Sequence, residues 1–241
     1  MPAESQEPEL VRWRPWPCES CRGGAPLIDY LLGRHEAGGE IPGGSEDEVI
    51  EEMIARERAW VVEWAESCEH TAERSETLAR LDEGSEHIVY LAPGGKVVVK
   101  LTKPGLYGDA YYLVDGRVHQ RCCTPGDYMI RLSMLELTFG FAPTPVGITK
   151  AGQIVTRQRF VEGEPPTLNE VEEFLLRERF EPVKRSCWLW KRKDPNNEVE
   201  YWIGDAREDN FVKTPHGIVP IDLRMWGVPA EAPSPSQAEE S

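Results

Sequence analysis

The sequence predicts an α+β fold with an N-terminal helical segment and antiparallel strands. Three observations predict it. Apolar residues recur at helical spacing through residues 46–68. From Gly84 the period changes to alternation, with β-branched runs separated by glycine turns. A further pair of short apolar runs meets at a tight turn in residues 211–221, which is typical of antiparallel strands.

Composition limits the classes of function. The chain has 241 residues, which fits one domain of two lobes or one domain with an appendage. A formal charge of −15 argues against binding nucleic acid or an anionic membrane through a general basic surface. No apolar run approaches the roughly 20 residues that span a bilayer, and the N-terminus lacks the apolar core of a secretory signal. We therefore expect a soluble cytoplasmic protein.

The six cysteines lie at irregular spacing, unlike a secreted disulfide framework, so we expect reduced thiols. Cys18 and Cys21 form a C-x-x-C pair that follows an irregular arm rich in Glu and Pro. A zinc site would need further ligands, for which His35, Cys68 and His70 are the candidates. Incidental thiols near a turn are the other interpretation, and both stay open.

Two helices are predicted before the strands. The run Pro26–Gly33 predicts a short helix closed by Gly33. Ser45 and Glu48 form a capping box at the start of a long amphipathic helix, Glu46–Cys68, whose other face is charged. We expect residues 1–75 to form a helical extension.

A lysine ends the β-branched run of the second predicted strand. Residues 84–91 and 96–102 predict two strands around a glycine turn, and Lys100 closes the run VVVK. A buried lysine is unfavourable unless an acid or a phosphate meets it. Protein kinases present a lysine in this way to nucleotide phosphates and to a helix glutamate. Exposure of Lys100 on an edge strand is the alternative.

The next segment supplies a hairpin and a helix. Residues 111–114 and 117–119 predict the hairpin, and residues 124–127 open a helix that runs to Phe139 and is closed by Gly140. Glu136 is the acid best placed for Lys100, with Asp127 as the alternative. A solvated surface role for Glu136 stays open.

After the outer strand, the sequence predicts a connection between two lobes. We expect the Gly- and Pro-containing segment Phe160–Pro166 to be a hinge that offers backbone groups to a flat base. Thr167 caps a helix that reaches Phe180. Residues 186–190 and 198–203 predict another hairpin, and the Pro/Ala/Ser/Glu-rich tail after Trp226 is predicted to be disordered.

Three polar residues follow that hairpin. Asp205 and Asn210 are spaced D-x-x-x-x-N, and a turn carries Asp222 back beside them. Phosphoryl transfer needs one carboxylate to orient the attacking hydroxyl, and an amide oxygen and a second carboxylate to hold magnesium. The alternative is that these residues serve only as turn and capping residues.

Five stretches together resemble the polyvalent-protein kinase family, a divergent protein-kinase-like branch of bacteria and phages. They read GSEHIVYL, VVVKLTKPGLYG, IVTRQRFVEGEPPT, WIGDAREDNFVKTP and IVPIDL. These stretches lie within roughly residues 70–225, and the resemblance implies a two-lobed fold with an antiparallel N-lobe sheet at residues 76–162 and a reduced C-lobe at 163–226. The tail predicted from composition is then residues 227–241.

The resemblance also implies roles for single residues. Lys100 would bind the α- and β-phosphates of ATP, and Asp205 would be the catalytic acid–base residue. Asn210 and Asp222 would hold Mg²⁺. The activity implied is ATP- and magnesium-dependent transfer of the γ-phosphate to a hydroxyl of a protein or a small molecule.

The chain departs from the kinase pattern in two places. Of the glycine-rich nucleotide loop only Gly84 and Ser85 remain, and too little sequence follows Asp222 to form the helices that dock a peptide. A pseudokinase-like module that binds nucleotide or a protein without turnover is therefore the second hypothesis. A metal-stabilised interaction protein built on the cysteines is the third.

Overall fold

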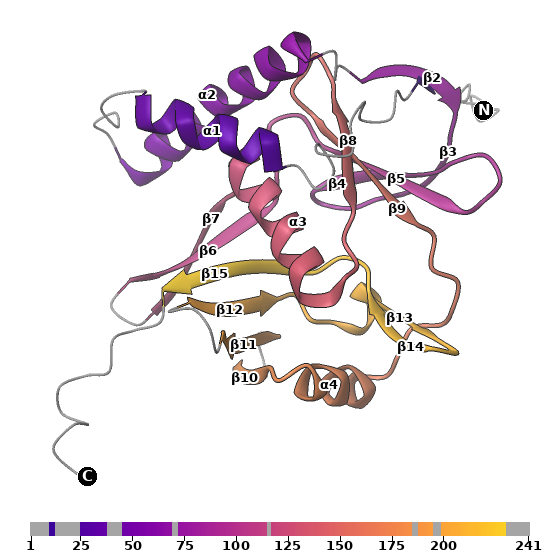
Figure 1. The fold of residues 1–241 in the computed structure, drawn as a ribbon. Coiled ribbons are helices and arrows are strands. Elements are labelled where there is room, and N and C mark those ends of the chain that lie inside the picture. Colours follow the sequence, from indigo (N-terminus) through magenta and orange to yellow (C-terminus); the bar gives the residue numbers. More distant parts are fainter. Residues whose placement is uncertain are drawn as a thin grey trace, which may run out of the picture. The chain divides into compact units, whose positions relative to one another are not determined.

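The structure is a computed structural model. It describes residues 10–12, 25–37, 45–68, 72–114, 117–184, 188–194 and 199–229. The chain divides into two compact units, residues 1–110 with 120–161 and residues 111–119 with 162–241. Each unit combines helices with antiparallel strands, so the predicted α+β class is confirmed (Figure 1). Within the described residues, no helix has the length and hydrophobicity to cross a membrane.

Three helices belong to the first unit. These are α1 (Ala25–Ala37), α2 (Glu46–Ser67) and α3 (Pro125–Phe139). The capping box of Ser45 and Glu48 starts α2 as predicted, and Thr124 caps α3. Gly140 ends α3 in the left-handed conformation, with φ 64°.

The predicted end of α1 at Gly33 is wrong, because the helix continues for another turn. Arg34 pairs with Glu63 at 2.6 Å, and His35 contacts Glu57 at 2.8 Å. Both partners lie on α2. These contacts between two helices hold the last turn of α1 in place and outweigh the low helix propensity of a single glycine.

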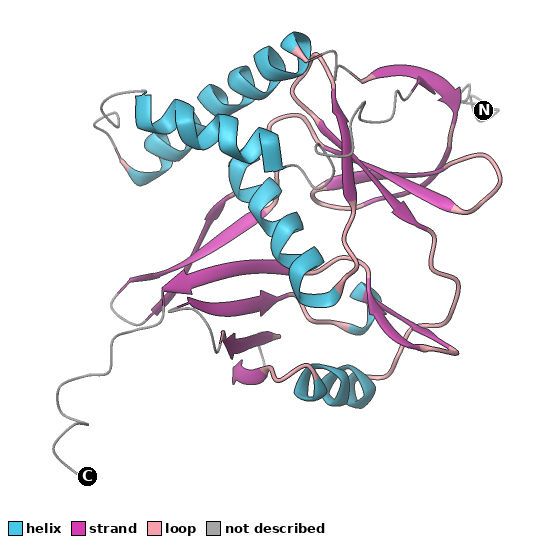
Figure 2. Cartoon of the chain, viewed as in Figure 1, coloured by secondary structure: helices cyan, strands magenta, loops and turns pink. Residues whose placement is uncertain are grey.

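The sheet of the first unit has five antiparallel strands (Figure 2). They are β3 (Ala79–Glu83), β4 (His87–Leu91), β5 (Val97–Thr102), β8 (Thr144–Ile148) and β9 (Ile154–Arg159), in the order β3-β4-β5-β9-β8. The predicted strands at residues 84–91 and 96–102 are confirmed. A small sheet pairs β1 (Leu10–Arg12) with β2 (Glu73–Thr77). Another pairs β6 (Asp109–Val114) with β7 (Arg117–Cys122), and residues 111–119 of this pair belong to the second unit.

Two apolar clusters stabilise this unit. One joins the three helices to β8 and β9, through Leu27, Leu31, Val61, Trp64, Ala65, Tyr107, Cys123, Tyr128, Met129, Leu132, Ile148 and Ile154. The other covers one face of the sheet, through Leu78, Tyr90, Ala92, Val99, Leu101 and Val155. The N-terminal helices therefore pack against the rest of the first unit. The division at residue 75 stays a prediction.

The second unit is richer in strands. Its helix is α4 (Leu168–Arg177), which Thr167 caps as predicted, although it ends before Phe180. Its larger sheet has the order β10-β11-β12-β15, formed by β10 (Glu181–Lys184), β11 (Leu189–Lys193), β12 (Val199–Gly204) and β15 (Arg224–Pro229). The predicted hairpin of β13 (Phe211–Thr214) and β14 (Gly217–Pro220) is confirmed.

The tail begins later than predicted. Residues up to Pro229 continue β15, which pairs with β12 along its length. Trp226 stacks on Tyr111, with ring centroids 4.2 Å apart, and also contacts Trp202. Burial of these aromatic side chains holds a segment whose composition alone indicates disorder. The residues after 229 lie outside the described part of the chain.

Candidate functional site

The loop between β12 and β13 carries two of the expected site residues. Asp205 follows the last residue of β12 and has a left-handed backbone, with φ 59°. Such a conformation is uncommon outside glycine, although aspartate tolerates it better than most residues. A short 3-10 helix, Glu208–Asn210, then turns the chain into β13. The predicted curled loop is confirmed.

Asn210 joins this loop to Asp222. Its side-chain Nδ2 donates to the Asp205 carbonyl at 2.6 Å. Its own carbonyl accepts from the backbone N–H groups of Ile221 at 2.9 Å and Asp222 at 3.4 Å. One buried residue therefore brings the two aspartates to the same end of the second unit, as the sequence predicts.

The hydrogen bond from Nδ2 also fixes the orientation of the Asn210 amide, because Nδ2 and Oδ1 cannot exchange without losing it. Oδ1 accepts no hydrogen bond from any described residue. The side chain of Asp222 is exposed. An unengaged amide oxygen and an exposed carboxylate are ligand types that Mg²⁺ binds, so the donor chemistry fits this metal.

Two arginines flank Asp205 and were missed by the sequence reasoning. Arg207 Nε lies 2.7 Å from Asp205 Oδ1, and Arg224 Nε lies 3.9 Å from Oδ2. Arg224 also donates to the Tyr111 hydroxyl at 3.2 Å. These contacts orient the Asp205 carboxylate. The position of Arg207, two residues after Asp205, is the sequence signal that could have indicated this ion pair.

Packing explains why a glycine, Gly204, precedes Asp205. A Cβ on Gly204 would lie 3.2 Å from the Trp226 ring, closer than ordinary contact. The glycine therefore lets β12 pass close to the aromatic cluster immediately before the loop. The cluster supports the strand end that presents Asp205.

Lys100 lies on β5, a central strand between β4 and β9, and its exposure is 7%. The alternative of an exposed lysine on an edge strand is therefore wrong. Counted along the chain, β5 is the third strand of the five-stranded sheet, and α3 is the next helix. Lys100 and the Asp205 loop belong to different units, and each is described within its own unit.

The turn at Gly84 and Ser85 is tight. Gly84 N–H donates to the His87 carbonyl at 3.0 Å, which closes a short connection between β3 and β4. Glu86 in this turn pairs with the buried guanidinium of Arg131 on α3, and His87 Nε2 lies 3.0 Å from the Tyr128 hydroxyl. The turn is thus fastened to α3, which the sequence did not indicate.

The two acids of α3 that were considered for Lys100 have other contacts. Glu136 is exposed, and its carboxylate accepts from the Ala142 N–H at 3.0 Å. Asp127 binds both terminal nitrogens of Arg121 and accepts from the Thr124 N–H at 2.9 Å. The pairing of Lys100 with either acid stays a prediction.

The segment expected to be a hinge is anchored at its far end. Glu164 and Lys213 exchange backbone hydrogen bonds, at 3.2 and 2.8 Å. A Cβ on Gly163 would lie 2.2 Å from the Lys213 carbonyl, so this close approach requires glycine. The Lys213 ammonium lies 2.7 Å from Glu170, and this hydrogen bond, with those from Thr167, lowers the pKa of Glu170 to about 2.

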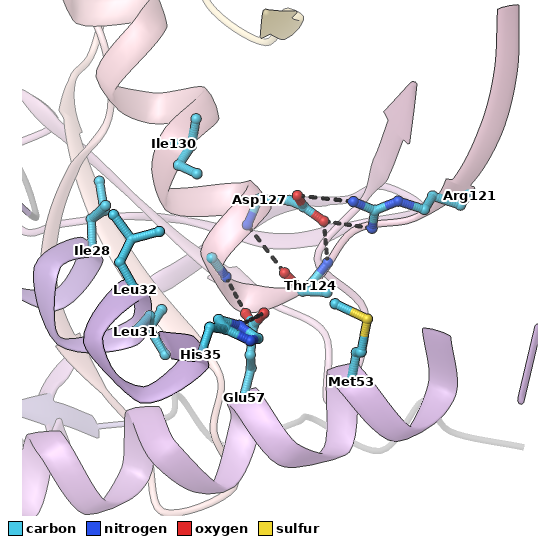
Figure 3. Close-up of a pocket in the computed structure, with 11 residues that line it drawn as sticks. Ile28, Leu31, Leu32, His35, Met53, Glu57, Arg121, Thr124, Asp127 and Ile130 are labelled. Carbon is cyan, nitrogen blue, oxygen red and sulfur yellow. Dashed lines mark hydrogen bonds and ion pairs between the residues drawn. The ribbon is translucent and has the colours of Figure 1, made fainter. Parts of the chain in front are cut away.

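A cavity of about 240 Å³ lies among the helices of the first unit (Figure 3). Its apolar wall comes from the three helices, through Ile28, Leu31, Leu32, Met53 and Ile130. The polar groups on the other side of the cavity form hydrogen bonds with one another. The buried Glu57 carboxylate contacts His35 and accepts from the Gly126 N–H at 2.7 Å, at the start of α3. Glu57 thereby satisfies a backbone donor that the first turn of a helix leaves open.

The cysteine hypothesis falls mostly outside the described residues, which exclude Cys18, Cys21 and His70. Cys68 is described and exposed, and burial raises the pKa of the Cys123 thiol. Among described residues, no group of three or more His, Cys, Asp or Glu side chains could hold a metal ion.

Comparison of the chain with family models, with curated proteins and with solved structures gave no match.

Proposed function

We propose that the protein is a magnesium- and ATP-dependent phosphotransferase of two-lobed, protein-kinase-like fold. The observation that carries the proposal is the arrangement around Asn210, which holds Asp205 and Asp222 together and leaves its own amide oxygen unengaged. The buried Lys100, on the third strand of an antiparallel sheet and ahead of α3, adds support from the other unit.

The proposed chemistry is in-line transfer of the γ-phosphate to a hydroxyl. Asn210 Oδ1 and the Asp222 carboxylate would hold Mg²⁺, which supplies positive charge against the phosphates when bound. Asp205 would orient the attacking hydroxyl and accept its proton, with its carboxylate held by Arg207. Lys100 would neutralise charge on the phosphates.

A specific observation favours the second candidate, a module that binds nucleotide without turnover. The turn at Gly84 is closed by a hydrogen bond from the Gly84 N–H to the His87 carbonyl, so it offers less backbone to phosphates than a glycine-rich loop does.

Binding and turnover of ATP separate the two candidates. A phosphotransferase should show a rise in melting temperature with ATP that grows when Mg²⁺ is added, and should consume the ATP. For Asp222→Ala we expect weakened nucleotide binding and loss of its dependence on Mg²⁺. Stabilisation by Mg²⁺ and ATP without turnover would support the binding module. No shift with any nucleotide would reject both.

A further inference from the structure

The cavity among the three helices of the first unit has an apolar wall that a ligand can reach (Figure 3). Its volume is about 240 Å³, whereas a cavity of about 150 Å³ is enough to bind benzene. Leu32 on α1 and Ile130 on α3 belong to the wall and are 52% and 37% exposed, so the cavity is open to solvent at these two side chains. The space therefore fits one ring or a short alkyl chain.

A buried acid belongs to the same lining. The Glu57 side chain is 4% exposed. Its Oε1 lies 2.8 Å from His35 Nε2, and its Oε2 accepts from the Gly126 N–H at 2.7 Å. A carboxylate offers about four lone-pair positions, so these two hydrogen bonds leave part of its accepting capacity unused.

The contact with Glu57 determines what His35 offers to the cavity. An ionised carboxylate only accepts hydrogen bonds, so a neutral imidazole here carries its proton on Nε2 and leaves Nδ1 as an acceptor. Within the described part of the chain, Nδ1 makes no hydrogen bond. A donor for this atom therefore comes from water or from a ligand.

The charges of the lining do not balance. Arg121 and Asp127 form an ion pair through both terminal nitrogens of the guanidinium, at 2.7 and 3.1 Å, and offset each other. With His35 neutral, two carboxylates face one guanidinium in the lining, so Glu57 leaves one net negative charge. The charge of −15 on the whole chain also favours the approach of a cation.

We propose that this cavity binds a small protonated amine that carries one ring or a short alkyl chain. The apolar part packs against the wall, and the ammonium donates to His35 Nδ1 and offsets the charge of Glu57. A carboxylate ligand does not fit, because Glu57 repels it and Arg121 is already paired. A neutral apolar ligand displaces water from Glu57 and His35 without replacing its hydrogen bonds. The inference does not depend on the proposed function.

The test is an NMR titration of the full chain at about pH 8, where an ordinary histidine is neutral. The methyl signals of Met53 and Ile130, which line the cavity, report binding there. Three ligands of similar size are compared, namely benzylamine, which is protonated at this pH, benzyl alcohol and benzoate. We expect benzylamine to bind with a Kd of about 1 mM or tighter, and about 10-fold more tightly than the other two.

The first variant, Glu57→Gln, removes the charge but keeps an amide oxygen for the Gly126 N–H. The new amide nitrogen donates to His35 Nε2, so the ring proton moves to Nδ1 and this acceptor becomes a donor. Affinity for benzylamine should fall by about 10-fold, to the level of benzyl alcohol.

Leu32→Lys is the second variant, and it leaves Glu57 unchanged. It places an ammonium at the open side of the cavity, so benzylamine should bind about 5-fold more weakly. Leu137→Lys is the matched control, because it adds the same charge at a position on α3 that is 83% exposed and outside the lining. This control should leave the affinity unchanged.

Several results would overturn the inference. They are equal affinity for benzylamine and benzyl alcohol, tighter binding of benzoate, and no response of either methyl signal to benzylamine. An unchanged preference for benzylamine in Glu57→Gln, or equal effects of Leu32→Lys and Leu137→Lys, would also overturn it.

Discussion

Asp205 has a backbone conformation that non-glycine residues adopt at a cost of about 1–2 kcal/mol. The Asn210 amide and the Arg207 N–H both donate to its carbonyl, at 2.6 and 2.8 Å, and the Arg207 side chain holds its carboxylate. Several contacts thus hold Asp205 in an unfavourable backbone conformation. Conformations of this kind concentrate where a side chain must be presented in a fixed direction.

The unsatisfied hydroxyl of Thr156 leads to a prediction about stability. Thr156→Val removes a buried group that lacks a partner and keeps the side-chain shape, so the free energy of unfolding should rise by about 1 kcal/mol or more. Chemical denaturation of the unliganded protein measures this change in the free energy of unfolding.

Thr102→Val is the matched control on the same sheet face. Its hydroxyl accepts from the Ile154 N–H, which the substitution would leave without a partner. The free energy of unfolding should fall by about 1–3 kcal/mol. Destabilisation of similar size in both variants would show that Thr156 is satisfied in the unliganded protein.

Local signals predicted helix starts better than helix ends. The capping boxes at Ser45 and Thr167 are formed as expected, because a cap involves only residues within one turn. The end of α1 depends on contacts with α2, and β15 depends on pairing with β12. Neither partner is adjacent in sequence, so local patterns carried no information about them.

Two helix glycines should respond to alanine in opposite directions. Gly33 lies inside α1 with open space where a Cβ would be, so Gly33→Ala should raise the free energy of unfolding by about 0.5–1 kcal/mol. Gly140 ends α3 with φ 64°, so Gly140→Ala should lower it by about 1 kcal/mol. Thermal and chemical denaturation of both variants check this, and a loss of stability in Gly33→Ala would contradict the helix continuing through it.

At the scale of the whole chain, the N-terminal helices contribute to the core of the first unit. Leu27 and Leu32 lie on the same helix, α1, but are 1% and 52% exposed. Leu27→Ala should lower the free energy of unfolding by about 2–5 kcal/mol, whereas Leu32→Ala should change it by about 0.5 kcal/mol or less. Equal, small effects would mean that α1 does not pack as described.

The candidate site was predictable in part. The D-x-x-x-x-N spacing and the following turn predicted that Asp205, Asn210 and Asp222 would gather, because a hairpin returns the chain to its start. The ion pairs of Asp205 with Arg207 and Arg224, and the contact of Glu136 with Ala142, depend on side-chain orientations that spacing does not determine.

The central claim is that the chain transfers phosphate with Asp205 and Asp222. The most direct measurement is incubation of the full chain with ATP labelled in the γ-phosphate, with and without Mg²⁺ and with candidate protein acceptors. We predict magnesium-dependent transfer or release of the label, reduced by about 10²–10⁴ in Asp205→Ala and Asp222→Ala. Unchanged turnover in either variant, or none in the unmodified protein under any of these conditions, would contradict the account.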